Sequence, residues 1–263
     1  HRHAHPPRSF FDVCGYVSGA RARRAIETNQ RHPMAEPSAA ALLAAPLPAG
    51  ADVLVIVAHP QLEQSRANRR LMQAARNAAA EAEGAQPSIV VRDLYALYPD
   101  YLIDVAAEQA LLARARLVVW QHPIHWYGMP PLMKLWLDDV LVFGWAYGPD
   151  GTALRNKDLW LAATTGGPED SYRPNSYNRY FFDAFLPPYE QTAALCGMRF
   201  LPPLMLHGTH RASDEQIRAH AAVYAERLAS YPAWPEIAAL PECPTCEVPL
   251  TARPLENFAE VGV

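Results

Sequence analysis

The chain has 263 residues, of which 50% are hydrophobic and 19% are charged, and its formal net charge is -4. This composition is typical of a soluble protein long enough to bury one large core, so it excludes a fully disordered chain, a collagen-like fibre and a disulfide miniprotein. The acidic balance of mixed charges also argues against a domain built to neutralise nucleic-acid phosphates. We therefore expect no nucleic-acid partner.

The cysteine and histidine content predicts neither a disulfide framework nor a metal site. Four cysteines are too few for a chain of this size, so a reducing, cytoplasmic compartment is the default interpretation. Cys243 and Cys246 form a lone CxxC, which is either part of an inert tail or a redox or metal motif that would need a second pair of ligands. His122 and His125 lie three residues apart without an accompanying carboxylate, so we expect no metal there.

Both ends of the chain differ in composition from its centre. Residues 1–50 are rich in His, Arg, Pro and Ala without sustained apolar periodicity, and are interpreted as a disordered or accessory segment. Met34 lies where the composition changes and is a candidate for the true start. The apolar stretch after it resembles a signal peptide or membrane span, but Pro46 and Asp52 interrupt it. Residues 232–263 are proline-rich and are interpreted as a disordered tail.

Residues 51–231 contain short apolar runs that alternate with helical patterns. The runs of strand length cover 52–58, 88–94, 115–121, 159–165 and 199–206. The segments with helical length and spacing cover 67–83, 106–115, 130–141, 180–195 and 213–229. Near-continuous apolar strands that alternate with helices indicate a parallel sheet covered on both faces. The sequence therefore predicts one α/β domain, a three-layer sandwich with a five-stranded parallel sheet.

Three of the loops that follow the predicted strands have unusual composition. With the strand order 2-1-3-4-5, ligands bind beyond the carboxyl ends of the strands where the order reverses, between strands 1 and 3. Strands 1, 3 and 4 are then neighbours, and the loops after them cover 59–68, 122–131 and 164–172. The loop after strand 2 carries no comparable set of residues. A ligand site is therefore expected where the three loops converge.

The first loop leads into a helix that Ser65 or Asn68 can cap. Hydroxyl and backbone N–H groups then converge at the positive end of the helix, which is an arrangement suited to an anion, although most such caps hold no ligand. Neither GxxxxGK[ST] nor GxGxxG occurs in the sequence. This absence argues against a nucleoside triphosphate and against a Rossmann dinucleotide grip.

The second and third loops complete the pattern. His125, Trp126 and Tyr127 follow a buried strand, where aromatic side chains either stack on a flat ring or pack under the next helix. Residues 164–167, Thr-Thr-Gly-Gly, offer hydroxyls and close backbone approach, or alternatively form only a tight turn. The three loops together would provide a phosphate site, aromatic side chains that can stack on a flat ring, and the Thr and Gly residues at 164–167 along the edge of that ring. This combination describes an FMN pocket.

Three segments of the sequence carry a family resemblance. They are VLVIVAHPQLEQSRANRRL, a central region that includes YPDYLIDVAAEQ, WQHP and GWAYGPDGTAL, and CGMRFLPPLMLHGTH. Over residues 52–231 the chain resembles the flavodoxin-like NAD(P)H:quinone oxidoreductases, and within these it looks most like the KefF- and KefG-type ancillary proteins of glutathione-regulated potassium-efflux systems. The resemblance implies a flavodoxin-like fold, a homodimer, FMN, and two-electron reduction of quinones by NADH or NADPH. It also implies a peripheral position on the cytoplasmic face of the inner membrane, beside the antiporter.

The resemblance also implies particular site residues, carried over by position. The FMN contacts would be His59, Ser65, Arg66, Ala67, Asn68, Ile124, His125, Trp126, Tyr127, Thr164, Thr165, Gly166 and Gly167. Tyr172 lies where family members often carry a catalytic tyrosine that helps to polarise the flavin or the quinone. The segment that follows it, RPNSYNRY, departs from the family's histidine-bearing pattern.

Two functions of different class follow from the resemblance. In the first, the protein is an oxidoreductase that detoxifies quinones. In the second, it is a regulatory subunit whose flavin fold mainly serves to bind and activate a potassium antiporter, with little enzymatic activity of its own. The retention of all three loops favours at least residual enzymatic competence, and the two functions do not exclude each other.

Overall fold

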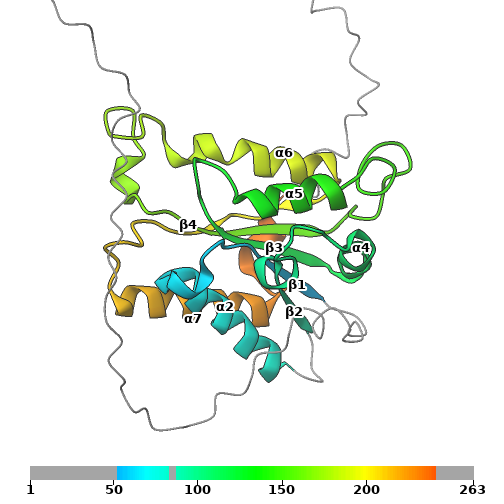
Figure 1. Cartoon of the computed structure of the whole chain (residues 1–263), viewed down its shortest axis with the longest axis horizontal. Coiled ribbons are helices and arrows are strands. Elements are labelled where there is room, and N and C mark those ends of the chain that lie inside the picture. Colours follow the sequence, from blue (N-terminus) through cyan, green and yellow to red (C-terminus); the bar gives the residue numbers. More distant parts are fainter. Residues whose placement is uncertain (1–51, 83–86, 241–263) are drawn as a thin grey trace, which may run out of the picture. The chain divides into compact units, whose positions relative to one another are not determined.

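A computed structural model describes residues 52–82 and 87–240 (Figure 1). The predicted accessory segment 1–50, the candidate start at Met34 and the CxxC of Cys243 and Cys246 lie outside the described residues. The description below therefore concerns the central domain.

The domain is built on a parallel sheet with the predicted strand order. The strands are β1 (Val53–Val57), β2 (Ile89–Asp93), β3 (Leu117–Pro123), β4 (Asp158–Thr164), β5 (Arg199–Phe200) and β6 (Leu204–Leu206). They pair in parallel in the order β2-β1-β3-β4-β5, and β6 also pairs with β4. The flavodoxin-like topology is thus confirmed, with a sixth strand added.

The sixth strand arises because the predicted strand 199–206 is divided in two. Pro202 and Pro203 lie between β5 and β6. A proline has no backbone N–H to donate to a neighbouring strand, so the ladder to β4 breaks at these residues and resumes at Leu204.

The five predicted helices are present, one of them shortened, together with a four-residue helix that the sequence did not predict. They are α2 (Arg66–Glu81), α3 (Leu94–Leu97), α4 (Val105–Arg114), α5 (Pro131–Val140), α6 (Pro187–Leu195) and α7 (Asp214–Ser230). The predicted helix 180–195 begins only at Pro187, because proline is tolerated in the first turn of a helix and not in its interior. Four short 3-10 helices complete the fold: η1 (Leu62–Gln64), η2 (Glu169–Ser171), η3 (Phe182–Phe185) and η4 (Pro235–Ala239).

Helices cover both faces of the sheet, as the apolar strands predict. Figure 1 shows α5 and α6 on one face and α2 and α7 on the other. Alternate residues of β1 enter the two cores: Leu54 and Ile56 pack in the cluster that contains α5, and Val53 and Val55 pack in the cluster that contains α2 and α7. All five residues of β1 are buried, so the strand forms the centre of the domain.

The folded domain extends beyond the boundary predicted at residue 231. Trp234 is only 4% exposed, its ring lies 4.8 Å from that of Trp160, and its Nε1 donates a hydrogen bond to the Arg227 carbonyl. Residues 232–240 therefore belong to the packed domain and not to a tail. Proline content suggested a tail, but a single buried indole is enough to anchor this short segment.

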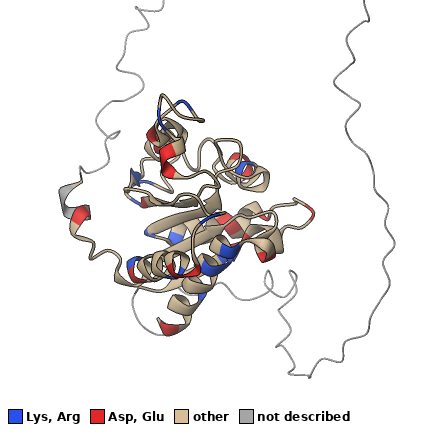
Figure 2. Ribbon diagram, turned by 90° about the vertical axis from the view of Figure 1, so that its left-hand side faces the viewer, with Lys and Arg blue, Asp and Glu red and all other residues tan. Residues whose placement is uncertain are grey.

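Charged residues of both signs are interspersed over the helices and loops (Figure 2). Among residues 52–82 and 87–240, no helix is both long enough and apolar enough to cross a bilayer.

Candidate functional site

The carboxyl ends of β1, β3 and β4 bring the three predicted loops together. In the sheet register Val57 lies beside Gln121, and Pro123 lies beside Thr164. The Asn68 side chain donates a hydrogen bond to Thr164 Oγ1 at 2.9 Å, which joins the first loop to the third. The Ile124 N–H donates to the Thr164 carbonyl at 2.8 Å, which joins the second loop to the third. All three loops therefore line one edge of the sheet.

The N-terminus of α2 provides a set of donors. Ser65 is its N-cap, and the Ser65 hydroxyl oxygen accepts a hydrogen bond from the Asn68 N–H at 3.0 Å. The N–H groups of Arg66 and Ala67 have no acceptor among the described residues, as expected in the first turn of a helix. These donors and the helix dipole together favour an anion at this end of the helix.

The Arg66 side chain is turned towards α7. Its guanidinium forms an ion pair with Asp214 at 2.7 Å and donates to the Ala212 carbonyl at 3.1 Å. Of the two groups that Arg66 could offer to a ligand, the backbone N–H is therefore available and the guanidinium is already paired.

Two buried amides lie behind the anion site. Gln121 Nε2 donates to the Asn68 carbonyl at 3.0 Å, and both residues are almost fully buried. The amide oxygens Oδ1 of Asn68 and Oε1 of Gln121 have no hydrogen-bond partner among the described residues. Buried polar atoms are nearly always paired in folded proteins. Two unpaired oxygens at the switch point therefore indicate a place where a ligand or ordered water completes the structure.

Two histidines face each other across the loops. The rings of His59 and His125 lie 6.1 Å apart in an edge-on arrangement, and His59 Nδ1 accepts a hydrogen bond from the Gln61 N–H at 3.0 Å. Burial and the neighbouring His125 lower the pKa of His59 to about 4, and burial also lowers the pKa of His125. Both rings are therefore neutral at pH 7.

The aromatic pair of the second loop lies at the tip of a tight hairpin. His125 and Gly128 form an isolated bridge, and Trp126 and Tyr127 have positive φ angles of 48° and 64°. Trp126 is 95% exposed, so it does not pack under the following helix. Tyr127 stacks on Phe185 at 5.1 Å. Positive φ is uncommon for bulky residues, and such conformations often occur at ligand sites.

The third loop presents a Gly/Thr edge. The N–H groups of Gly166 and Gly167 have no acceptor among the described residues. A Cβ on residue 166 would lie 2.7 Å from His210 Nε2, and a Cβ on residue 167 would lie 2.9 Å from Ser171 Oγ. A side chain at either position would therefore require His210 or Ser171 to move. The N–H groups of Gly166 and Gly167, which have no acceptor among the described residues, are what this edge offers to a ligand.

Tyr172 occupies an aromatic pocket next to this edge. It is 8% exposed, and its ring lies 5.2 Å from that of Phe182 and 5.6 Å from that of His207. Burial raises the pKa of Tyr172, and a hydrogen bond with the Thr165 side chain partly offsets this rise. The phenol is therefore protonated at neutral pH.

The sequence analysis missed two residues of this edge, His207 and Asn178. His207 Nδ1 lies 2.9 Å from Thr165 Oγ1, and Asn178 Oδ1 accepts a hydrogen bond from the Tyr127 hydroxyl at 3.2 Å. His207 directly follows β6, so the same strand-end rule would have found it had it been applied to the last strand. Asn178 comes from a loop without periodicity, and nothing in the sequence alone places it.

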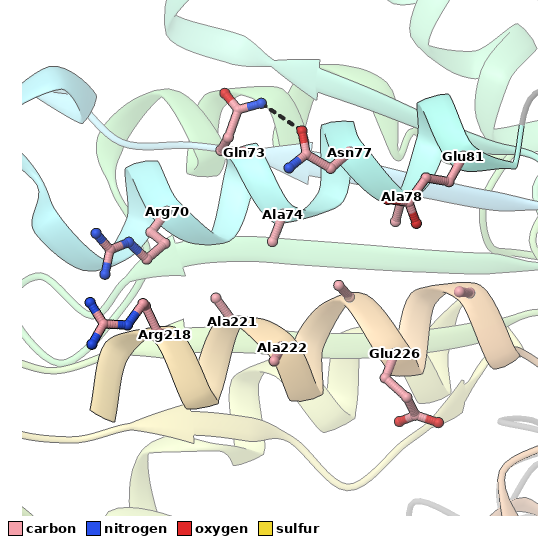
Figure 3. Close-up of a pocket in the computed structure, with 12 residues that line it drawn as sticks. Arg70, Gln73, Ala74, Asn77, Ala78, Glu81, Arg218, Ala221, Ala222 and Glu226 are labelled. Atoms are coloured by element: carbon pink, nitrogen blue, oxygen red, sulfur yellow. Dashed lines mark hydrogen bonds between the residues drawn. The ribbon is translucent and has the colours of Figure 1, made fainter. Parts of the chain in front are cut away.

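Some of the cavities formed by the described residues lie away from this edge. A groove of about 530 Å³ runs between α2 and α7 and has alanines at its base, including Ala74 and Ala221 (Figure 3). A cleft of about 550 Å³ at the opposite edge of the sheet is lined by Arg116, Lys157 and Asp158 among others. The described residues contain no cluster of three or more His, Cys, Asp or Glu side chains arranged for a metal ion.

The fold and this edge define the class of protein. Residues 51–228 match a family described by its flavodoxin-like fold, and the chain belongs to that family. Within it, the chain is similar to the glutathione-regulated potassium-efflux system ancillary protein KefF of Citrobacter koseri, with 48% identity over 179 residues that cover 68% of this chain and 96% of the relative. The resemblance drawn from the sequence is thereby confirmed.

Two solved structures extend the comparison. General stress protein 14 of Treponema denticola, determined in complex with FMN, is 37% identical with a TM-score of 0.62, and the match covers 68% of this chain and 98% of that one. A protein assigned as a quinone reductase from Klebsiella pneumoniae is 28% identical with a TM-score of 0.57, and the match covers 68% and 83% of the two chains.

Proposed function

We propose that the protein is an FMN-dependent NAD(P)H:quinone oxidoreductase that acts as the ancillary protein of a glutathione-regulated potassium-efflux antiporter. The observation that carries the proposal is the convergence of unpaired polar groups at the carboxyl edge of the sheet. The KefF relatives support the link to potassium efflux, and the FMN complex of the Treponema denticola protein supports the choice of flavin.

The groups at this edge fit the parts of FMN. The N–H groups of Arg66 and Ala67 and the hydroxyl proton of Ser65 would hold the phosphate, because the Ser65 oxygen already acts as an acceptor and its proton has no acceptor among the described residues. The N–H groups of Gly166 and Gly167 would hold the pyrimidine edge of the ring. The remaining predicted contacts, His59, Asn68, Ile124, His125, Trp126, Tyr127, Thr164 and Thr165, come from the same three loops.

Bound FMN would supply the hydride chemistry, accepting a hydride from NADH or NADPH and passing it to a quinone. The protein supplies donors and a suitable charge. The Gly166 and Gly167 N–H groups would stabilise negative charge on the pyrimidine edge. His59 and His125 are neutral and place no fixed charge beside the ring. Tyr172 is protonated, so its hydroxyl can donate a hydrogen bond, and then a proton, to a quinone oxygen.

Two further features of the resemblance belong to this proposal. We propose a homodimer, supported by the exposed aromatic side chains of Trp126, Tyr177, Tyr180 and Phe181, since exposed apolar groups that gather on a monomer often mark an interface. We also propose a peripheral position on the cytoplasmic face of the inner membrane, supported by the similarity to ancillary proteins of a potassium-efflux system.

Turnover of the FMN-loaded protein tests the enzymatic part of the proposal. Consumption of NADH and NADPH is followed with 1,4-benzoquinone as acceptor, and one molecule of quinol should form for each nicotinamide oxidised. Protein that binds FMN but catalyses no quinone reduction with either nicotinamide would contradict this part.

Potassium efflux tests the ancillary part. Cells that carry the cognate antiporter should release potassium faster with the protein than without it. Equal efflux in the two strains would contradict the ancillary role and leave the enzymatic role standing.

A further inference from the structure

The cleft at the end of the sheet away from the three loops is lined mainly by positive charge. It lies where β3, β4 and β5 begin, because Asp158 is the sheet neighbour of both Leu117 and Arg199. Its volume is about 550 Å³, and its cationic lining residues are Arg114, Arg116, Arg155, Lys157 and Arg199. Asp158 is the one acidic residue among the described residues that line it. The net charge of the chain is -4, so this cleft is opposite in sign to the molecule as a whole.

The Asp158 carboxylate leaves most of this positive charge without a counter-charge. It already accepts two hydrogen bonds from Arg199, at 2.7 and 3.0 Å, and one from the Tyr231 hydroxyl at 2.9 Å. Arg116 and Arg155 are exposed, and within the described part of the chain no carboxylate forms an ion pair with either of them. The Arg116 guanidinium lies 5.7 Å from the centre of the Tyr231 ring. Two exposed guanidinium groups of the cleft are therefore available to an anion.

Lys157 adds a third cation in a fixed position. Its ammonium group donates to the Ala113 carbonyl at 2.9 Å and also to the Ala115 carbonyl, at the end of α4. These acceptors belong to the negative end of a helix dipole but carry no full charge. Burial lowers the pKa of Lys157. An anion in the cleft would oppose this shift, because a neighbouring negative charge favours the charged form of lysine.

The segment that follows the domain begins beside this cleft. Ile237 belongs to η4 and lines the cleft, and the Leu240 N–H donates to the Ile237 carbonyl at 3.3 Å. The ion pair between Glu236 and Arg227 fixes η4 to α7. The last described residue, Leu240, is therefore held close to the cleft, and residues 241–263 continue from this point.

Residues 241–263 carry charge of the opposite sign to the cleft. They contain one arginine and the four glutamates Glu242, Glu247, Glu256 and Glu260. An extended chain spans at most about 3.5 Å per residue, so Glu242 lies within about 7 Å and Glu247 within about 25 Å of Leu240. Both carboxylates can reach the cleft. Because they are tethered to the domain, their effective concentration there is of the order of millimolar, far above that of most free anions.

We propose that Glu242 and Glu247 dock in the cationic cleft of their own chain, beside Arg116 and Arg155. Residues 241–263 lie outside the family match, which ends at residue 228. The docked segment competes with any other acidic peptide for the cleft, so an acidic partner can enter only by displacing it. The proposal does not rest on the proposed function, because the loops that would hold flavin lie at the other end of the strands.

The first test is carbodiimide crosslinking of the full-length chain, which joins a carboxylate to an amine in contact with it. The chain contains only two lysines, so few amines compete. Arg116→Lys keeps the positive charge and places an exposed amine in the cleft. Arg76→Lys is the matched control, because Arg76 is an exposed arginine of α2 that does not line the cleft. Peptide mass spectrometry should find the bond from position 116 to Glu242 or Glu247 at least about tenfold more often than the bond from position 76.

Isotope mixing distinguishes the possible occupants of the cleft. When nitrogen-15-labelled and unlabelled Arg116→Lys proteins are mixed before crosslinking, bonds within one chain join two peptides of the same label. We expect such pairs to predominate. Pairs of mixed label alone would assign the segment to a second copy and overturn the proposal. Crosslinks to Glu242 and Glu247 no more frequent than in the Arg76→Lys control would also overturn it.

The second test measures competition, with fluorescently labelled poly-L-glutamate as the probe. The double variant Glu242→Gln and Glu247→Gln should bind the probe about tenfold more tightly than the wild type, because the tethered competitor is lost. Adding Arg116→Ala and Arg155→Ala should abolish this difference, and high salt should reduce it by screening the exposed charges. Equal affinity in the wild type and the glutamine variant, or a difference that persists without the two arginines, would overturn the proposal. FMN affinity should be the same in all four forms.

Discussion

The strands of the sheet begin at one end, the amino edge, and finish at the other, the carboxyl edge. These two ends differ in how their buried polar groups are paired. At the amino edge, the Asp158 carboxylate accepts two hydrogen bonds from Arg199, at 2.7 and 3.0 Å, and one from the Tyr231 hydroxyl at 2.9 Å. Lys157 donates to the Ala113 carbonyl at 2.9 Å and also to that of Ala115, at the end of α4. At the carboxyl edge, Asn68 and Gln121 each keep a buried oxygen that has no hydrogen-bond partner within residues 52–82 and 87–240.

Buried polar groups at the two ends of the same strands therefore have different roles. The amino edge satisfies its buried charges internally, so its network contributes to stability and to the ordering of residues 231–240. Among the described residues, the carboxyl edge leaves donors and acceptors without partners, at a cost in stability that a bound ligand would offset. The comparison predicts that substitutions at the amino edge lower the free energy of unfolding without changing flavin affinity. Substitutions at the carboxyl edge should lower flavin affinity with little change in the free energy of unfolding.

The largest expected effect is that of Asp158→Ala. It leaves the Arg199 guanidinium and the Tyr231 hydroxyl without their buried acceptor, and we expect the free energy of unfolding to fall by about 3 kcal/mol. Denaturant titration measures this change, and FMN affinity should stay within twofold of the wild type. Asp138→Ala is the control, because its exposed ion pair with Lys134 contributes at most about 0.5 kcal/mol. Similar losses in the two variants would contradict the distinction between the edges.

The second prediction concerns acid stability. Burial lowers the pKa of His122 from its ordinary value of 6.5 to about 4, so the unfolded chain binds a proton between these values and the folded domain does not. Stability is therefore full above pH 6.5 and falls as the pH drops towards 4, by up to about 3 kcal/mol from this group. His122→Asn does not titrate and keeps a donor for the Pro123 carbonyl. Its unfolding free energy should depend less steeply on pH, and an unchanged slope would refute the assignment.

The third prediction sharpens the comparison at the anion site. Ser65→Asp places a carboxylate where the flavin phosphate would bind, so FMN affinity should fall about 100-fold, which is about 3 kcal/mol. Stability should change little, because aspartate is a good N-cap and favours the positive helix end. Ser65→Asn, a neutral cap, should retain most of the affinity. Unchanged affinity in Ser65→Asp would mean that the phosphate binds elsewhere.

The smallest expected effect on stability is that of Trp126→Ala. The side chain is 95% exposed, so the free energy of unfolding of the isolated domain should change by less than about 0.5 kcal/mol. Self-association, measured by sedimentation, should weaken if this residue contributes to a dimer interface. A large loss of monomer stability would show that the exposed hairpin packs in solution.

The sheet could be predicted from the sequence because each strand is marked by its own short run of apolar residues. Short, β-branched apolar runs such as 53–57 favour strands buried on both faces, and the strand-end rule then placed Ser65, Asn68 and Thr164 together. Two errors have different causes. Prolines at 202 and 203 divided the last strand, which is a local effect, whereas Trp234 anchored a segment whose composition suggested a tail by packing on the distant Trp160.

Other features depend on contacts between distant residues. The bond between Thr165 and His207 joins residues 42 positions apart, and periodicity says nothing about it. Likewise, the neighbour of Gly166 is His210, far along the chain, and the partner of Arg66 is Asp214 on α7. The sequence therefore predicted which residues lie at the site, whereas only the structure shows which of them are hydrogen-bond or ion-pair partners.

The central claim is that the carboxyl edge of the sheet holds FMN. Titration of FMN into the flavin-free wild-type protein, followed by flavin fluorescence and by the melting temperature, tests it directly. The account predicts saturable binding of one FMN per chain, a higher melting temperature, and loss of affinity in Ser65→Asp but not in Asp158→Ala. A protein that cannot be reconstituted with FMN, or one whose FMN affinity is the same in all three forms, would contradict it.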